Sequence, residues 1–137
     1  RRFGLYKNAS SAKRKLRILA KKKLADKDFA QEFQIVVKKY LEFRFGTSFA
    51  SVTGKNFINA IEDIVGGELP DEILETLEDM TQIFVRMNYI RFAQGSIDSK
   101  LLPREKYEAA FVGDEKSATL KKMTGIIDIL EKGYGND

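Results

Sequence analysis

The chain of 137 residues contains no cysteine, no histidine and no tryptophan, and it has only two prolines. Without cysteine it has no disulfide framework, no thiolate metal site and no cysteine nucleophile. Without histidine it lacks the commonest general base and the commonest metal ligand of proteins. These absences leave serine, threonine and carboxylate side chains as the candidates for catalysis, and a hydrolase of that kind would need a cleft that brings two such groups together. We expect neither a cofactor nor a metal.

Long hydrophobic runs are absent as well, so no segment of the sequence is apolar enough to span a bilayer. No signal peptide is recognisable. The chain begins Arg1-Arg2-Phe3 without a methionine. We interpret it as the soluble part of a longer protein, in which residues 1–9 form a juxtamembrane or linker segment.

Apolar residues make up 43% of the chain, which is enough for one core, and they recur at helical spacing almost throughout. The pattern predicts an all-α, single-domain bundle of five to six helices over residues 10–132, with a basic N-terminal helix and a flexible tail at 133–137. The start and stop signals of these helices are caps, glycines and prolines. They predict helices over 10–25, 28–45, 53–65, 70–92, 103–111 and 114–131.

Charge is distributed unevenly along the chain. Residues 1–27 hold eleven Lys/Arg and one acid, Asp26, which is a net charge of +10; the remainder holds thirteen Lys/Arg and nineteen acids, a net charge of −6. A basic head on an acidic body indicates a charged partner on one side of the domain. The predicted binding residues are Lys13, Arg14, Lys15, Arg17, Lys21, Lys22 and Lys23.

Three interpretations of this basic helix remain open. It is a solvated helix face, a surface that docks on anionic lipid or an acidic partner, or a nucleic-acid contact. Basic clusters gain about 1 kcal/mol per residue near an anionic membrane. Nucleic acid is disfavoured, because the acidic body would repel a polyanion and Asn8 is the one amide among these residues that could read a base.

Catalytic motifs are not apparent in the rest of the chain. Acids are many, but the set Asp71, Glu72, Glu75, Glu78 and Asp79 falls on the solvent side or first turn of the helix over 70–92, where it complements the helix dipole. The tracts Gly46-Thr47-Ser48 and Thr53-Gly54-Lys55 lack the spacing of a phosphate-binding loop. We therefore predict that the protein is not an enzyme.

The order of these signals over residues 10–95 resembles the cytoplasmic C-terminal domain of BatD-type aerotolerance proteins. A basic segment is followed by an acidic–aromatic helix, here residues 28–41, and by Val52-Thr53-Gly54-Lys55-Asn56-Phe57. A turn at Gly66-Gly67 then precedes a long helix that ends in Ile90-Arg91-Phe92-Ala93-Gln94-Gly95. The segment 97–113 and Gln94, where the family often has proline, depart from the pattern.

The resemblance implies a stress-tolerance protein of the inner membrane with this domain at its cytoplasmic face. It also implies two protein partners, von Willebrand factor A-domain proteins and a MoxR-type AAA+ ATPase. No catalytic residues are implied. The working hypothesis is a non-enzymatic interaction and scaffolding domain at the membrane, and the alternative is a small basic helical nucleic-acid-binding domain.

Overall fold

The computed structural model describes residues 2–46, 56–93 and 110–134, and the side chains of 8–46, 56–92 and 110–133 within them. This part of the chain forms five α-helices and contains no strand. Their bounds are α1 Arg2–Lys21, α2 Asp26–Phe45, α3 Phe57–Val65, α4 Asp71–Ala93 and α5 Glu115–Tyr134. The all-α helical bundle predicted from apolar spacing is confirmed.

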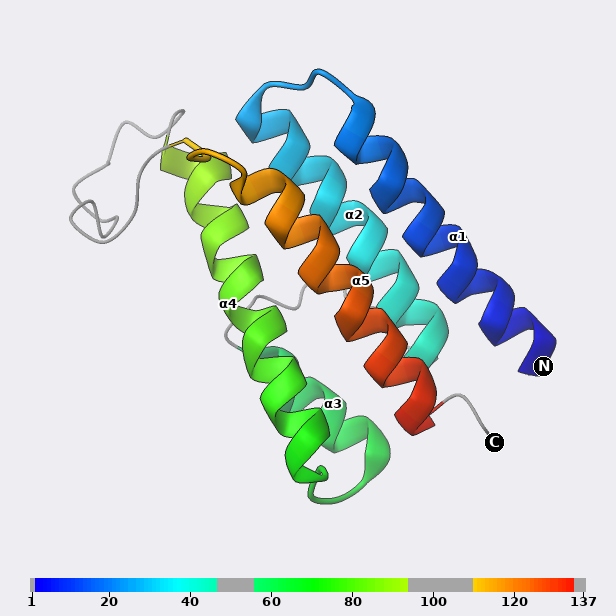
Figure 1. The fold of residues 1–137 in the computed structure, drawn as a ribbon. Coiled ribbons are helices and arrows are strands. Elements are labelled where there is room, and N and C mark those ends of the chain that lie inside the picture. Colours follow the sequence, from blue (N-terminus) through cyan, green and yellow to red (C-terminus); the bar gives the residue numbers. More distant parts are fainter. Residues whose placement is uncertain (1, 47–55, 94–109, 135–137) are drawn as a thin grey trace.

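Four long helices form a ring in which each helix is antiparallel to its neighbours (Figure 1). Helix α1 packs on α2 and α5, and α4 packs on the other sides of the same two helices. The short helix α3 packs on α4 at one end of the bundle. Helices α1 and α4 therefore occupy opposite edges of the molecule, and this placement matters for the charges discussed below.

The core is built from the apolar stripes of all five helices. Phe57 of α3 and Phe84 of α4 meet edge to face with ring centroids 4.7 Å apart, and Phe33 of α2 lies 6.4 Å from Phe84. Such aromatic pairs add to the stabilisation from buried area. The largest fully buried side chains are Phe29, Phe33, Phe57, Phe84, Leu16, Leu41, Ile61, Leu77, Met80, Met87 and Ile90.

Helix ends that depend on local signals lie where the sequence places them. Gly46 and Gly66 follow α2 and α3 in the left-handed conformation, with φ of 71° and 76°, which glycine adopts at little cost. Pro70 directly precedes α4, and Asp114 directly precedes α5. The predicted cap at Thr53 and most of the predicted helix over 103–111 lie outside the described residues.

The prediction of the first helix over 10–25 is wrong at both ends, because α1 begins at Arg2 and ends at Lys21. Contacts with α5 hold the short segment that follows α1. The Leu24 carbonyl accepts a hydrogen bond from Lys116 at 3.2 Å, and Asp26 pairs with the same ammonium at 3.1 Å. Helix α2 begins at Asp26 and not, as predicted, after a cap at Asp28.

Candidate binding surface

Helix α1 consists largely of alanine, leucine, lysine and arginine, which are strong helix formers. It buries Ala9, Ala12, Leu16 and Leu19 in the core. These residues recur every three or four positions, so they leave the opposite side of the helix to solvent. Most of the basic side chains of α1 therefore point outward, because the buried apolar stripe is narrow.

Three cations lie on this outward side, and we call them the basic face: Arg14, Arg17 and Lys21. They surround Ile18, whose side chain is 47% exposed, and with Ala20 they line a shallow hollow of about 380 Å³. Within the described part of the chain, none of the three forms a hydrogen bond or ion pair. The basic face is thus an uncompensated positive surface.

Two of the seven predicted binding residues are neutralised by acids of other helices. Lys13 pairs with Asp128 of α5 at 2.7 Å, and Lys22 pairs with Glu32 of α2 at 3.1 Å. Both contacts are solvent-exposed, and such pairs are worth at most about 1 kcal/mol. Even so, Lys13 and Lys22 each contact an acid of another helix, so their charges are less available to a partner than those of the basic face.

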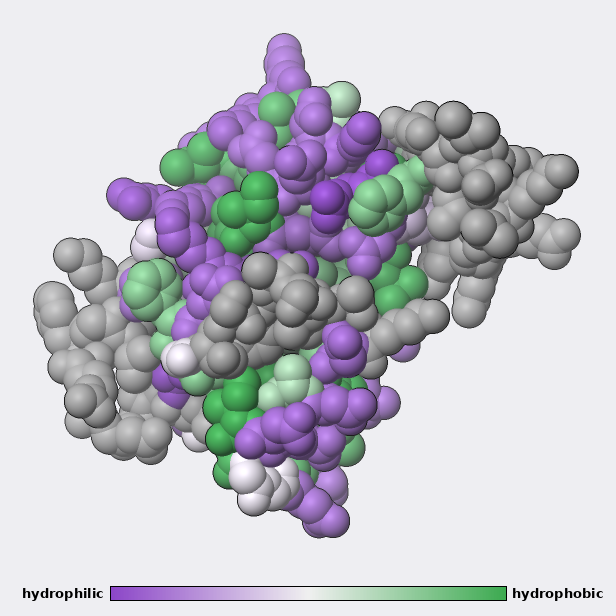
Figure 2. Space-filling model, turned by 180° about the vertical axis from the view of Figure 1, so that it is seen from behind, coloured by the Kyte–Doolittle hydropathy of each residue, from purple (hydrophilic) through white to green (hydrophobic). Residues whose placement is uncertain are grey.

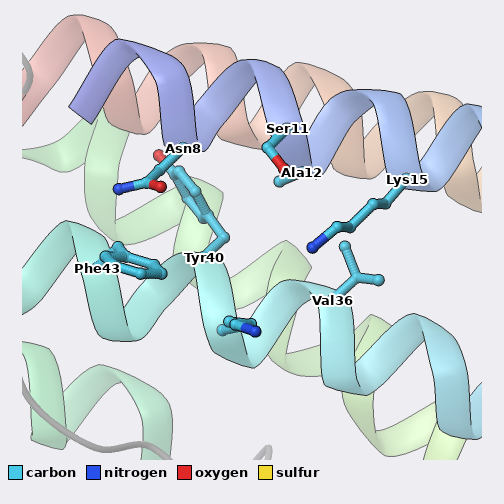
Figure 3. Close-up of a pocket in the computed structure, with 8 residues that line it drawn as sticks. Asn8, Ser11, Ala12, Lys15, Val36, Tyr40 and Phe43 are labelled. Atoms are coloured by element: carbon cyan, nitrogen blue, oxygen red, sulfur yellow. The ribbon is translucent and has the colours of Figure 1, made fainter. Parts of the chain in front are cut away.

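The remaining two predicted residues flank the basic face. Lys15 leans toward α2 at one end of a small hollow of about 100 Å³, where its side chain lies beside Val36, while Asn8 and Phe43 lie at the other end (Figure 3). Lys23 is exposed but lies beyond the end of α1, in the turn to α2. The structure therefore does not bring all seven residues onto one helix face.

One further cation of this side was missed by the sequence interpretation. Helices α1 and α5 are antiparallel, with Lys13 opposite Asp128 and Leu24 opposite Lys116. Lys121 lies between Lys116 and Asp128 on α5, so it is level with the C-terminal half of α1, and it is exposed. No local signal links Lys121 to residues a hundred positions earlier, because only helix packing brings them level.

Acidic residues gather on the opposite edge of the bundle. Residues 56–85 hold eight acids and no Lys or Arg. On α4, four of them are exposed, namely Asp71, Glu72, Glu75 and Glu78. Asp71, Glu75 and Glu78 recur at steps of four and three residues and so share one side of the helix, which we call the acidic face. No hydrogen bond or ion pair joins these three to any described residue, whereas Asp79 pairs with Lys122 at 3.5 Å. The solvent-side position predicted for these acids is confirmed.

A second hollow, of about 460 Å³, lies between α2 and α4 and was not anticipated. Arg91 donates to buried Gln34 at 2.6 Å, and Gln34 donates to Asn88 at 2.8 Å. Burial and the Arg91 charge lower the pKa of Lys38, while Glu42 opposes that shift. The residues that line this hollow carry charges of both signs. Where the back of the molecule is coloured by hydropathy, hydrophobic (green) side chains lie in small groups among hydrophilic (purple) ones (Figure 2). The hollow is therefore a less distinctive surface than the basic face.

The buried ionisable groups bridge helices. Tyr40 donates to Glu131 at 2.6 Å, and Arg44 lies 3.4 Å from the same carboxylate. Burial and this hydrogen bond raise the pKa of the Tyr40 hydroxyl far above its usual value. Among the described residues no group of three or more His, Cys, Asp or Glu is placed to hold a metal ion. No helix in the described ranges is both long and apolar enough to cross a membrane.

A third bridge makes part of the stability dependent on pH. Arg86 of α4 donates two hydrogen bonds to Glu115 of α5, at 2.7 and 3.0 Å, and these lower the Glu115 pKa from its ordinary 4.5. Because the Glu115 pKa is lower in the folded than in the unfolded state, its ionised form stabilises the fold at pH values above the unfolded-state pKa. This stabilisation is lost as the pH falls through the folded-state pKa. We expect the difference in unfolding free energy between wild type and Glu115→Gln to shrink below about pH 4.5 in urea titrations. A difference unchanged down to about pH 3 would contradict this.

Comparisons with protein-family models, with characterised proteins and with solved structures found no match. The resemblance to BatD-type proteins and the partners it implies stay predictions. Function is therefore argued from the two charged faces.

Proposed function

We propose that the protein is a non-enzymatic interaction domain that docks through its basic face on the anionic cytoplasmic surface of a membrane. One observation carries this proposal. Arg14, Arg17 and Lys21 share one exposed side of α1 and have no acidic partner among the described residues. Anionic headgroups would supply the missing negative charge.

The placement of the acids supports the same orientation. With α1 on the lipid, α4 points away from it, because the two helices are on opposite edges of the bundle (Figure 1). The acids of α4, which anionic headgroups would repel, would then be held away from the membrane by the width of the bundle. Ile18, at the centre of the basic face, adds apolar contact but is too small an anchor for insertion by itself.

The test is vesicle co-sedimentation of wild type and Arg14→Gln/Arg17→Gln/Lys21→Gln. At about 1 kcal/mol per basic residue, the triple variant should bind phosphatidylserine-containing vesicles about a hundredfold more weakly. Binding should also weaken as salt screens the charges. Glutamine keeps the helix intact, so circular dichroism should be unchanged.

A matched control separates position from net charge. Lys27→Gln/Lys39→Gln/Lys132→Gln removes the same charge from exposed sites outside the basic face. It should retain most of the binding. Equal affinity of wild type for neutral and anionic vesicles, or equal losses in the two triple variants, would reject the proposal.

Nucleic acid is the alternative ligand of the same cations. Phosphate contacts alone give binding that collapses as salt rises, by counterion release. A gel shift of duplex DNA at about 50 mM salt, without binding to anionic vesicles, would favour this alternative. The basic face offers no aromatic side chain on which a base could stack.

The scaffolding role within a BatD-like system is a finer form of the same proposal. Its partners would be a von Willebrand A-domain protein and a MoxR-type ATPase. Co-purification of the protein with such an ATPase would support it, provided that neutralising substitutions in the basic face or in the acidic face abolish the co-purification. The charged faces themselves do not select among protein partners.

A further inference from the structure

The basic face and the acidic face have mirror-image spacing. On α1 the cations stand at Arg14, Arg17 and Lys21, which are steps of three and four residues. On α4 the acids of the acidic face stand at Asp71, Glu75 and Glu78, which are steps of four and three. Exposed Glu72 lies beside this row, one residue after Asp71, and adds negative charge to it. Two helices laid antiparallel would thus set Lys21 against Asp71, Arg17 against Glu75 and Arg14 against Glu78.

The lengths of the two faces agree as well. Seven residues separate the outer members of each, which is about 10.5 Å along a helix axis. One step further along the same register places Ser10 against Gln82, and both are exposed and uncharged. No acid of α1 and no cation of α4 before Arg86 interrupts the pairing.

The two faces cannot meet within one molecule, because α1 and α4 lie on opposite edges of the bundle (Figure 1). We therefore propose that the basic face of one copy docks on the acidic face of a second copy, so that the protein associates head to tail. This inference goes beyond the proposed function, since it names a second occupant, another copy of the chain, for the same basic face. Such a heterologous contact leaves one free face at each end and builds open chains.

Head-to-tail contact is compatible with membrane docking. A copy held on lipid through α1 would still present its acidic face away from the membrane, where it would receive the basic face of another copy. Exposed ion pairs are individually weak and are screened by salt. The association should accordingly be reversible, dependent on concentration and suppressed by salt.

Sedimentation velocity of the whole chain tests the inference without any ligand. From about 10 µM to about 1 mM protein at low salt, the weight-average sedimentation coefficient should rise with concentration. Raising the salt to about 0.5 M should return the protein to monomer, since the screening length then falls to a few Å. A monomer at every concentration at low salt would overturn the inference.

Two neutralising variants give the sharper result. Arg14→Gln/Arg17→Gln removes two of the three charges of the basic face, and Glu75→Gln/Glu78→Gln removes two of the three charges of the acidic face. Each variant alone should associate about tenfold more weakly than wild type. Mixed together, they retain one complementary pair of faces and should form a 1:1 dimer that grows no further. Lys27→Gln/Lys39→Gln, with charge loss elsewhere, should associate like wild type.

The outcomes separate this inference from the membrane proposal. The acidic-face variant should bind anionic vesicles as wild type does, while losing self-association. Vesicle binding without any self-association would sink the head-to-tail contact and leave the proposed function standing. Other surfaces would have to be used if the basic-face variant and the acidic-face variant, each alone, still associated as wild type does. The same conclusion would follow if their mixture stayed monomeric while wild type associated.

Discussion

Replacing Phe84 with alanine should lower the free energy of unfolding by about 4 kcal/mol. Phe84 is 1% exposed and contacts Phe57 of α3 and Phe33 of α2, so its ring holds three helices together. Truncation removes buried apolar area and leaves a cavity that rigid neighbours fill only in part. Urea denaturation followed by far-ultraviolet circular dichroism measures the loss.

Phe92 provides the matched control on the same helix. Its side chain is 52% exposed, and it lies against the Arg91 guanidinium with 5.0 Å between that group and the ring centroid. The same substitution there should cost about 1 kcal/mol or less. If Phe84→Ala cost no more than Phe92→Ala, the junction of α2, α3 and α4 would not be packed as described.

Replacing Glu131 with leucine should cost about 3 kcal/mol, the second large effect. Glu131 of α5 accepts the Tyr40 hydroxyl and pairs with Arg44, both on α2, and the Arg44 side chain is only 4% exposed. Without the carboxylate, the buried Tyr40 hydroxyl loses its hydrogen-bond acceptor and the buried Arg44 charge loses its counter-ion. Equilibrium unfolding at pH 7 measures this cost.

A second substitution separates the charge from the packing. Arg44→Met combined with Glu131→Leu should recover much of the stability, because an apolar pair replaces a buried ion pair with little penalty. Asp128→Ala, which breaks the exposed pair with Lys13, should cost under about 1 kcal/mol. A double variant as unstable as Glu131→Leu alone would show that shape, and not charge, governs this site.

The sequence by itself determined the fold class, the buried stripes and several helix ends. Leu16, Phe33, Met80 and Ile127 all lie in the core, as their spacing predicts. Gly46 and Gly66 end helices because a left-handed residue is a local requirement that glycine meets alone. That basic side chains cover the exposed arc of α1 was predictable too, but which of the seven predicted cations make up the basic face was not.

Only the tertiary structure decided which charges are free and how the charged surfaces are arranged. Lys13 and Asp128 are 115 residues apart, and nothing local distinguishes Lys13 from Arg14 as the partner of that acid. The segment after α1 is likewise held by Lys116 of α5, which donates to the Leu24 carbonyl from 92 positions further along the chain. The placement of the basic and acidic faces on opposite edges depends on the order in which four helices close the ring. Helical periodicity specifies which side of each helix is buried but not which helices become neighbours.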